Sequence, residues 1–374
     1  MIKICIGGDI SFHRIDNFVW GDGVSQEMRN HNLVIANLEA PLTNAEKRAK
    51  LRAYYLKARP DSVKWLFPFD ALSLANNHIL DYSAIGLSET INCLREAGID
   101  CFGAAESDDL VYKPYCYEMN GVKIAVFGAS QFLRSKLNNP NGPAGILSKK
   151  LIQSISQFKS QGYFIIVMPH WGLEHIPYPS PQERKTARKF VLSGADLVVG
   201  SHPHEIQAYE IIEGKHVFYS LGNFVFSSLD FAIQTPRLYK SILLSIEIGE
   251  DHKYNVKTFF CAQESDVVEL TCKEEALKTG EYLNQISEDL KLTALSYRKL
   301  FYDSFVNENL VRNRLKAKKL KDTQADSRVI TRVLLSAKML ITKLRYIDLQ
   351  MLKCILYMRI PILRKLILLL SICN

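Results

Sequence analysis

The chain has 374 residues, of which 47% are hydrophobic and 23% are charged, an ordinary globular composition. Its length suits one large α/β domain, or such a domain with an appendage. The eight cysteines are scattered and form no Cys-x-x-Cys pair. That pattern is typical of buried thiols in a reducing compartment and argues against a disulfide framework or a structural zinc site.

The net charge of +8 is concentrated at the C-terminal end. Residues 281–374 contain 18 Lys and Arg against 8 Asp and Glu, a net charge of +10, which leaves −2 for residues 1–280. The positive charge therefore says nothing about the substrate of the main domain. The first ten residues, MIKICIGGDI, lack the features of a signal peptide, and no window reaches the roughly 18 apolar residues of a membrane span. We therefore expect a cytoplasmic protein.

Short apolar runs alternate with segments of helical periodicity through residue 283. The expected strands are 2–6, 33–38, 69–74, 99–102, 115–119, 123–127, 163–168, 197–199, 216–221, 241–249 and 254–262. The expected helices are 82–97, 148–161 and 182–193, with a helix start at 59–66 and a closing element at 268–283. Asn120-Gly121 predicts a tight hairpin. This rhythm indicates an α/β fold with polar loops gathered at strand ends.

Five of the apolar runs are followed by residues that can bind a metal ion. These residues are Asp9, Glu39, Asn77-His78, His170 and His202-x-His204. Carboxylate, amide oxygen and imidazole together are the ligand set of a binuclear zinc, manganese or iron site. Two such ions lower the pKa of a bridging water and stabilise a phosphorus-centred transition state. The sequence therefore predicts a site for divalent metal ions, with two as the expected number.

Each of these residues has a purely structural alternative. Asp9 would cap a turn, and Glu39 would be a solvated acid on a loop. Asn77 would be a turn residue and His78 a contact at a helix start, while His170 would be a core histidine bonded to backbone. The His-x-His pair would lie on an ordinary surface loop. The occurrence of all of them at strand ends favours the site.

Five segments carry a resemblance to a known family. They are IGGDI, ANLEAPLT, LANNHILDYSAIGLSET, MPHWGLEHIPYPSPQE and GADLVVGSHPHEIQAYEIIEGKHVFYSLGNFVF. In this order, over about residues 2–262, they resemble the bacterial capsule-synthesis (CapA, poly-γ-glutamate biosynthesis) family, a branch of the calcineurin-like metallophosphoesterase superfamily. The resemblance implies a four-layer α/β/β/α sandwich over residues 1–283, followed here by a basic helical appendage over residues 284–374.

The resemblance also implies roles for individual residues. Asp9 matches the first metal-binding acid, and Glu39 stands where the superfamily more often has a bridging aspartate. Asn77 and His170 match metal ligands, as do His202 and His204, while His78 matches a catalytic residue near the phosphoryl oxygens. Trp171, Glu174 and Asn223 match residues of the pocket or behind the ligands. Asp81 either orients His78 through a hydrogen bond or caps the following helix.

The first motif departs from the superfamily pattern. Where the superfamily has Asp-x-His, this chain has Asp9-Ile10-Ser11. His13 comes two residues too late on a strand, although a loop would bring it near. His175, beside the His170-Trp171 block, is expected to be a loop residue. The departure concerns the first metal position, and with it full phosphatase competence.

Residues 284–374 lack glycine and are expected to form basic amphipathic helices. From residue 329 apolar turns alternate with single cations, which suits peripheral binding to the anionic inner face of a membrane. The alternative is a helical hairpin that packs on the main domain or on a protein partner. Nucleic-acid binding is not expected, because aromatic residues are not interleaved with the cations.

Two functions follow from these patterns. The first is a metal-dependent, phosphoesterase-like hydrolase that acts on a phosphoester or an anionic polymer during capsule or exopolymer biosynthesis. The second is a non-catalytic subunit of a membrane-associated capsule or polysaccharide assembly complex, in which the basic tail contacts capsule-assembly proteins. The sequence names neither the polymer nor the metal.

Overall fold

The computed structural model describes residues 1–49, 54–107, 110–132, 142–227 and 236–322, with side chains described as far as residue 308. Met1–Arg314 form the first of two compact units, and every contact below lies within it.

The larger sheet of this unit contains nine described strands. In spatial order they are β2 (Val19–Trp20), β17 (Val267–Leu270), β16 (Tyr254–Glu264), β15 (Lys240–Ile248), β1 (Ile2–Ile10), β3 (Leu33–Leu38), β4 (Ala71–Ser73) and β5 (Asp100–Phe102), and β14 (Asn223–Val225) also pairs with β1. The half that contains β14, β1, β3, β4 and β5 is parallel. Parallel pairing brings the carboxyl ends of these strands to one edge of the sheet.

The smaller sheet contains six described strands. In spatial order they are β12 (Tyr209–Ile212), β13 (Lys215–Phe218), β11 (Leu197–Val199), β10 (Phe164–His170), β8 (Val122–Ser130) and β7 (Tyr115–Met119). The four central strands are parallel, and β7 and β12 are antiparallel edges. Asn120 and Gly121 both have positive φ between β7 and β8, which is the backbone that the predicted tight hairpin requires. A separate two-stranded ladder joins β6 (Ala104–Ala105) to β9 (Gly142–Pro143).

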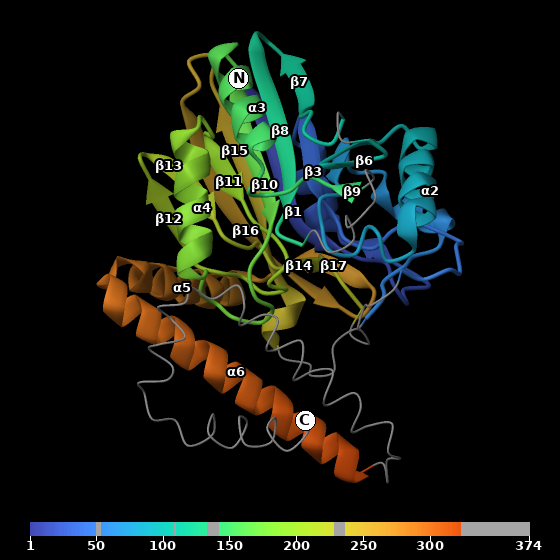
Figure 1. Ribbon diagram of the computed structural model, residues 1–374, viewed down its shortest axis with the longest axis vertical. Coiled ribbons are helices and arrows are strands. Elements are labelled where there is room, and N and C mark those ends of the chain that lie inside the picture. The colour runs from blue at the N-terminus through green and yellow to red at the C-terminus, as the bar shows by residue number, and fades with distance from the viewer. Residues whose placement is uncertain (50–53, 108–109, 133–141, 228–235, 323–374) are drawn as a thin grey trace. The chain divides into compact units, whose positions relative to one another are not determined.

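Helices cover the outer faces of both sheets (Figure 1). Helices α1 (Asp22–Arg29) and α2 (Ser83–Glu96) bury Val24, Met28 and Leu87 in one apolar cluster with Cys5 and Val34 of the larger sheet. Helices α3 (Lys149–Ser160) and α4 (Pro181–Leu192) lie over the smaller sheet, against β10 and β11. The four-layer α/β/β/α arrangement is therefore confirmed.

The two sheets pack face to face through apolar side chains and a few polar links. Because side chains alternate along a strand, Ile4 and Ile6 point away from the helix side of β1, and both are fully buried. Tyr254 of β16 spans the interface. Its ring lies 5.2 Å from that of Phe164 on β10, and its hydroxyl donates to the Asp196 carbonyl at 2.7 Å. Such contacts fix how the edges of the two sheets face each other.

Two expected elements differ from those observed. The first strand extends to Ile10, rather than ending at Ile6, because β3 and β14 pair with its last residues. The expected closing element at 268–283 is instead β17 followed by helix α5 (Lys273–Glu288). The helix start expected at 59–66 is the 3-10 helix η1 (Pro60–Leu66). The 3-10 helix η5 (Asp289–Lys291) follows α5.

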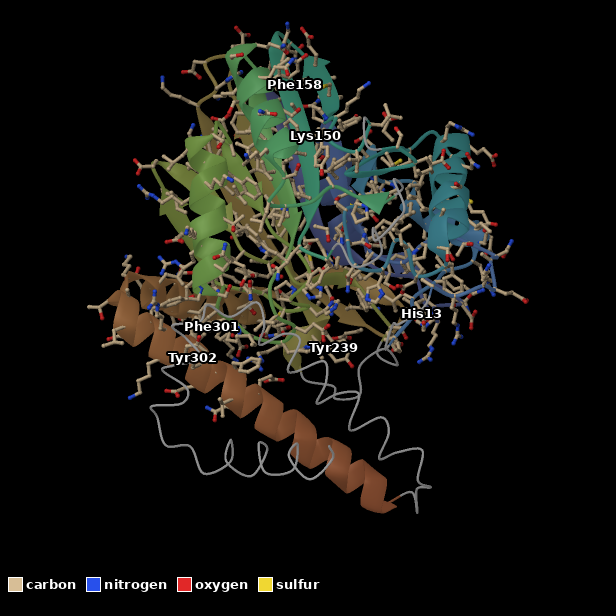
Figure 2. The ribbon with its side chains drawn as sticks, in the orientation of Figure 1. His13, Lys150, Phe158, Tyr239, Phe301 and Tyr302 are labelled. Atoms are coloured by element: carbon tan, nitrogen blue, oxygen red, sulfur yellow. The ribbon has the colours of Figure 1, made fainter. Side chains whose placement is uncertain are left out.

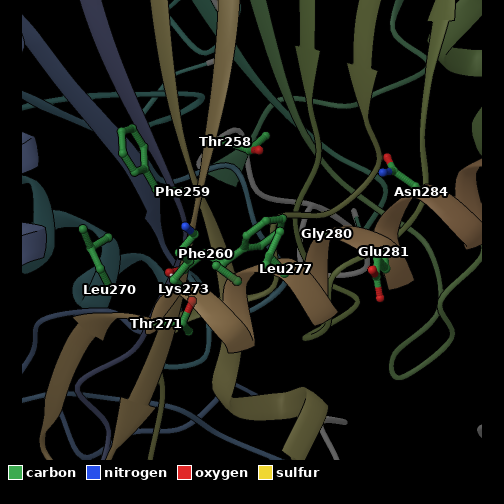
Figure 3. Close-up of a pocket in the computed structure, with 11 residues that line it drawn as sticks. Thr258, Phe259, Phe260, Leu270, Thr271, Lys273, Leu277, Gly280, Glu281 and Asn284 are labelled. Carbon is green, nitrogen blue, oxygen red and sulfur yellow. Dashed lines mark hydrogen bonds between the residues drawn. The ribbon is translucent and has the colours of Figure 1, made fainter.

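The domain boundary expected at 283/284 falls inside α5, and the compact unit continues to Arg314. The reason is burial of apolar residues beyond residue 283, among them Ile286, Leu290, Phe301 and Tyr302 (Figure 2). Phe301 and Tyr302 belong to α6 (Ala294–Asp322). A cavity of about 440 Å³ separates α5 from β16 and β17, with Phe260 and Leu277 in its wall (Figure 3).

The expected amphipathic pattern from residue 329 lies outside the described residues. The basic stretch from Arg312 to Lys321 belongs to α6. Along the part of the chain that the structure describes, no helix combines the length and the apolar character needed to cross a membrane.

Candidate metal centre

The predicted site residues come together where the two sheets meet at their strand ends. In the larger sheet, Asp9 of β1 is in register with Asn37 of β3 and Asn223 of β14. In the smaller sheet, His170 at the end of β10 is in register with Ser201, which follows β11. The Nδ1 atom of His170 lies 3.9 Å from Oδ1 of Asp9, so the two rows face each other across the interface.

Glu39 is the central residue of the site. Its side chain is fully buried, and it follows β3 directly. The Oε1 atom of Glu39 lies 3.6 Å from Nε2 of His170, 3.9 Å from Nε2 of His204 and 3.9 Å from Nε2 of His78. The end of β10 and the loops after β4 and β11 thus direct imidazole nitrogens at one carboxylate. This burial does not fit the alternative in which Glu39 is a solvated loop acid.

Asp9 is held rigidly beside this carboxylate. Its Oδ1 accepts a hydrogen bond from Nδ2 of Asn37 at 2.7 Å, and its Oδ2 accepts one from the backbone N–H of His202 at 2.9 Å. Burial raises the pKa of Asp9 from 3.8 to about 6, against the lowering effect of these hydrogen bonds. Asp9 lies within β1, so it does not cap a turn as the alternative interpretation had it.

His202 and His204 lie on a strained loop after β11. Both have positive φ, 98° and 61°, in a region that non-glycine residues seldom adopt and that is concentrated at functional sites. Both side chains are buried, which excludes an ordinary surface loop. The ring of Phe132 lies 4.4 Å from that of His202, and the ring of His175 lies 5.9 Å from that of His204. His175 is therefore a buried neighbour of the site as well as a loop residue.

The amide of Asn223 fixes the orientation of His204. Its Oδ1 lies 2.9 Å from Nδ1 of His204, and its Nδ2 donates to the Leu238 carbonyl at 3.0 Å. Because an amide oxygen only accepts, Nδ1 of His204 carries the proton in this arrangement. The lone pair of Nε2 is then directed toward Glu39, as a metal ligand requires.

The three side chains of the Asn-Asn-His segment after β4 have different roles. Asn76 is structural, since its Nδ2 donates to the Leu38 carbonyl at 2.8 Å and its Oδ1 accepts from two backbone N–H groups. Asn77 directs its Oδ1 to Nε2 of His170 at 2.8 Å. His78 contacts Oδ2 of Asp81 through Nδ1 at 2.6 Å. Of the two roles left open for Asp81, the structure shows the one that orients His78, because the N-cap residue of α2 is Tyr82.

His170 is a neutral group in this environment. It is buried, and burial lowers its pKa well below 6.5, with His202 and His204 lowering it further. The Nδ1 of His170 lies 2.9 Å from Oγ of Ser201, which fixes the ring plane. A neutral imidazole is the form that binds a metal ion.

Trp171 and Glu174 were expected in the pocket or behind the ligands. Trp171 is fully buried, and its indole N–H donates to the Tyr219 carbonyl at 2.9 Å while its ring stacks on Tyr219. Its backbone N–H donates to the Ser201 carbonyl at 3.1 Å, so Trp171 lies behind the loop that carries His202 and His204. Glu174 is partly exposed, with Oε2 lying 3.9 Å from Nε2 of His175.

In the structure, as in the sequence, the first motif has Ser11 where a histidine was expected. Ser11 is fully buried, and its Oγ accepts from the backbone N–H of His13 at 3.3 Å. The imidazole of His13 (Figure 2) has Nδ1 lying 2.8 Å from the carbonyl of Lys57, and it stands edge-on to Tyr54. The loop thus directs His13 to Lys57, because the backbone there offers it a partner.

Sequence reasoning missed three residues that shape the site: Asn37, Ser201 and Phe132. Asn37 had a signal, because it is the one polar residue in the apolar run Leu33–Leu38. Its neighbours Asp9 and His170 explain why an amide lies buried there. Ser201 precedes His202 directly, but nothing in its local pattern indicates that it meets His170.

The donor set fits a divalent metal ion. Ligand atoms of Glu39, His202 and His204 all lie within 4.8 Å of one another, and all three side chains are buried. A buried carboxylate is costly unless it is paired or coordinates a metal. Carboxylate with imidazole suits zinc, manganese or iron. The residues at hand thus form a candidate metal site.

Comparison with known proteins identifies the family of the chain. The family described as bacterial capsule synthesis protein PGA_cap matches residues 3–228. The chain belongs to this family. The matched range contains every predicted site residue, from Asp9 to Asn223, and therefore covers the whole candidate metal centre of this family member.

Two relatives are similar over the same part of the chain. The capsule biosynthesis protein CapA of Bacillus anthracis is 33% identical over 215 residues, 54% of this chain and 52% of the relative. The PGA biosynthesis protein CapA of Bacillus subtilis (strain 168) is 34% identical over 209 residues, 53% of this chain and 54% of the relative. The chain thus spans about half the length of the curated relatives it matches.

Among solved structures, the chain is similar to a putative 5′-nucleotidase from Staphylococcus aureus in complex with alpha-ketoglutarate. The TM-score is 0.44 and the identity 14%, over 76% of this chain and 58% of that one. The 5′-nucleotidase from Candida albicans SC5314 gives a TM-score of 0.41 at 14% identity, over 84% of this chain and 58% of that one.

Proposed function

We propose that the chain is a metal-dependent hydrolase that cleaves a phosphoester during the synthesis of a poly-γ-glutamate-type capsule. The observation that carries the proposal is the buried Glu39 carboxylate, with the Nε2 atoms of His78, His170 and His204 around one oxygen. The capsule context comes from the family and from the names of the two CapA relatives.

Glu39 lies between two groups of metal-binding side chains. On one side lie His202 and His204, and on the other lie Asn77 and His170. Each group would hold one divalent ion together with Glu39. When bound, such ions supply Lewis-acid stabilisation of phosphoryl oxygens and an acidified water.

The chain's own residues supply orientation and proton transfer. Asn223 keeps Nε2 of His204 unprotonated, and Asn37 and the His202 N–H keep Asp9 in place. His78 is the proposed general acid. Asp81 orients the ring through Nδ1, and the partly exposed position of His78 at the site lets Nε2 protonate a leaving-group oxygen.

Metal content and turnover test the proposal together. Protein purified without chelator is analysed for bound metals and assayed with a generic aryl phosphate, in wild type and His204→Ala. We expect bound metal and turnover in wild type, and a loss of both in the variant. His252→Asn is the matched control, because His252 lies in a turn at positive φ that asparagine also adopts. Wild-type protein that contains no metal and shows only background hydrolysis would refute the proposal.

A second candidate function is a non-catalytic subunit of a capsule assembly complex. Ser11 favours it, because the first motif lacks its imidazole and His13 contacts Lys57 instead. In this case the basic tail docks on the inner face of the membrane or on capsule-assembly proteins. Cell fractionation of the full chain and of residues 1–314 tests it. Equal sedimentation with membranes and equal partner recovery would show that residues 315–374 are not the docking element.

A further inference from the structure

A phenylalanine packs directly against the imidazole of His204. The ring of Phe226 lies 4.9 Å from that of His204, at an interplanar angle of 69°. The rings of His202 and His175 lie farther from His204, at 5.7 and 5.9 Å. An edge-on arrangement at such a distance is favourable for two aromatic rings. Of these three rings, that of Phe226 therefore makes the closest contact with His204.

The segment that begins with β14 supports His204 at two points. Asn223, the first residue of β14, contacts Nδ1 of His204 at 2.9 Å. The amide of Asn223 is fixed in turn by the Leu238 carbonyl in the 3-10 helix η4 (Pro236–Tyr239). Phe226 follows β14 directly. One short segment thus provides a hydrogen-bond acceptor and an apolar contact for the same imidazole.

The two contacts restrain different motions of the ring. The Asn223 acceptor determines which nitrogen of His204 carries the proton, but a single hydrogen bond still allows the ring to tilt. The last torsion of a histidine side chain is broad, because it joins a tetrahedral carbon to a planar ring, so a packed neighbour is needed to restrict it. Phe226 is such a neighbour, since it is buried and its backbone N–H donates to Oε1 of Gln263 at 2.7 Å.

Phe226 also belongs to a small apolar cluster beside the candidate metal centre. The buried members of the cluster are Ala40, Leu56 and Phe226. Ala40 follows Glu39 directly. The backbone N–H of Leu56 donates to Oδ2 of Asp81 at 2.7 Å, and the same oxygen contacts Nδ1 of His78. The cluster therefore joins the segment that follows β14 to the two segments next to Glu39 and to the partner of His78.

We propose that Phe226 is a positioning residue of the metal centre. Its ring, packed in the cluster with Ala40 and Leu56, holds the imidazole of His204 in the orientation that directs Nε2 at Oε1 of Glu39, 3.9 Å away. The inference rests on the proposed function, because it takes His204 as a metal ligand. Phe226 has no ligand atom of its own and acts only through His204.

Metal binding by the full-length protein tests the proposal. Phe226→Leu removes the ring and keeps an apolar side chain. We expect the affinity of metal-depleted protein for Co²⁺ to fall about tenfold, the lower end of the cost of losing a group behind a ligating histidine. The ligand-field absorption of bound Co²⁺ should also change, because it depends on the coordination geometry.

Phe164→Leu is the matched control. Phe164 is also buried, and its ring stands edge-on to another histidine, His252, at 5.9 Å. Phe164 begins β10, whereas His170 of the candidate site ends that strand. Both substitutions should lower thermal stability, but Phe164→Leu should leave the Co²⁺ affinity and spectrum unchanged. Equal losses of affinity in the two variants would overturn the proposal, because lost stability alone would account for them.

Leu56 gives a second test that leaves Phe226 and His204 in place, and it decides the question if Phe226→Leu does not fold. Leu56→Ala loosens the cluster but keeps the backbone N–H for Asp81, so it should also weaken Co²⁺ binding. Leu56→Met keeps the side-chain volume and should restore the wild-type affinity. Wild-type affinity and spectrum in Leu56→Ala and in folded Phe226→Leu would overturn the proposal.

Turnover of an aryl phosphate by wild type separates this inference from the proposed function. If wild type binds Co²⁺ without turnover, and affinity falls in Phe226→Leu but not in Phe164→Leu, the hydrolase is refuted and the positioning role is supported. Turnover in wild type with unchanged Co²⁺ affinity in Phe226→Leu refutes the positioning role alone. Wild type that binds no Co²⁺ refutes both.

Discussion

Oδ1 of Asn223 lies 2.9 Å from Nδ1 of His204, and this contact determines which nitrogen of His204 faces Glu39. Replacement of Asn223 by Leu removes the acceptor while keeping the side-chain volume. We expect metal affinity to fall about 10- to 100-fold, the usual cost of losing a partner behind a ligating histidine. Isothermal titration of metal-depleted protein with Mn²⁺ or Zn²⁺ measures it. Asn223→Asp keeps the acceptor and serves as the control, and equal affinity of both variants and wild type would contradict the assignment.

Asp81 and His78 provide a second test. Asp81→Asn keeps an oxygen for the backbone N–H of Leu56 but removes the carboxylate that orients His78 through Nδ1. We expect kcat for an aryl phosphate to fall about 100-fold, at the lower end of general acid catalysis, with little change in bound metal. An unchanged kcat would indicate that Asp81 only supports the fold.

The free energy of unfolding should depend on pH through Glu183, which lies away from the candidate metal centre. It occupies the third helical position of α4 in a capping box with Ser180, and burial raises its pKa from 4.5 to about 7. The folded state therefore binds the proton more tightly. The contribution of Glu183 to the free energy of unfolding is fully present below about pH 4.5 and is lost as the pH rises through about 7. At about 1.36 kcal/mol for each pKa unit, the change is about 3 kcal/mol.

Glu183→Gln keeps the capping box and removes the titration. Its free energy of unfolding should fall less between pH 5 and 8 than that of wild type. Urea denaturation at several pH values measures both. Parallel curves for the two proteins would refute the elevated pKa.

Gly222 and Gly214 form a matched pair for backbone strain. Both have positive φ, 80° and 73°, but a Cβ at Gly222 would lie 2.6 Å from the Lys240 carbonyl oxygen, whereas a Cβ at Gly214 meets nothing within 4 Å. Gly214→Ala should therefore cost about 1 kcal/mol for conformation alone. Gly222→Ala should cost several kcal/mol, because a contact with backbone cannot relax cheaply. Equal losses in thermal denaturation would mean that the loops around Gly222 move apart easily.

The chain order of the elements was largely predictable. Leu33–Leu38 and Tyr115–Met119 are strands with the expected bounds, because a mostly apolar run and an Asn-Gly turn are local signals. The end of β1 was not predictable. Its last residues carry glycines and Asp9, and they are in a strand only because β3 and β14 pair with them.

The candidate site shows the same division at the level of single residues. The sequence alone identified Asp9, Glu39, Asn77, His78, His170, His202 and His204, because polar residues at the ends of parallel strands gather at one edge whatever the details of packing. Tertiary structure alone decided that Trp171 lies in the core, that Asp81 contacts His78, and that His13 contacts Lys57. It also extended the compact unit from residue 283 to 314. These outcomes depend on which surfaces meet across the two sheets, and no local pattern encodes that pairing.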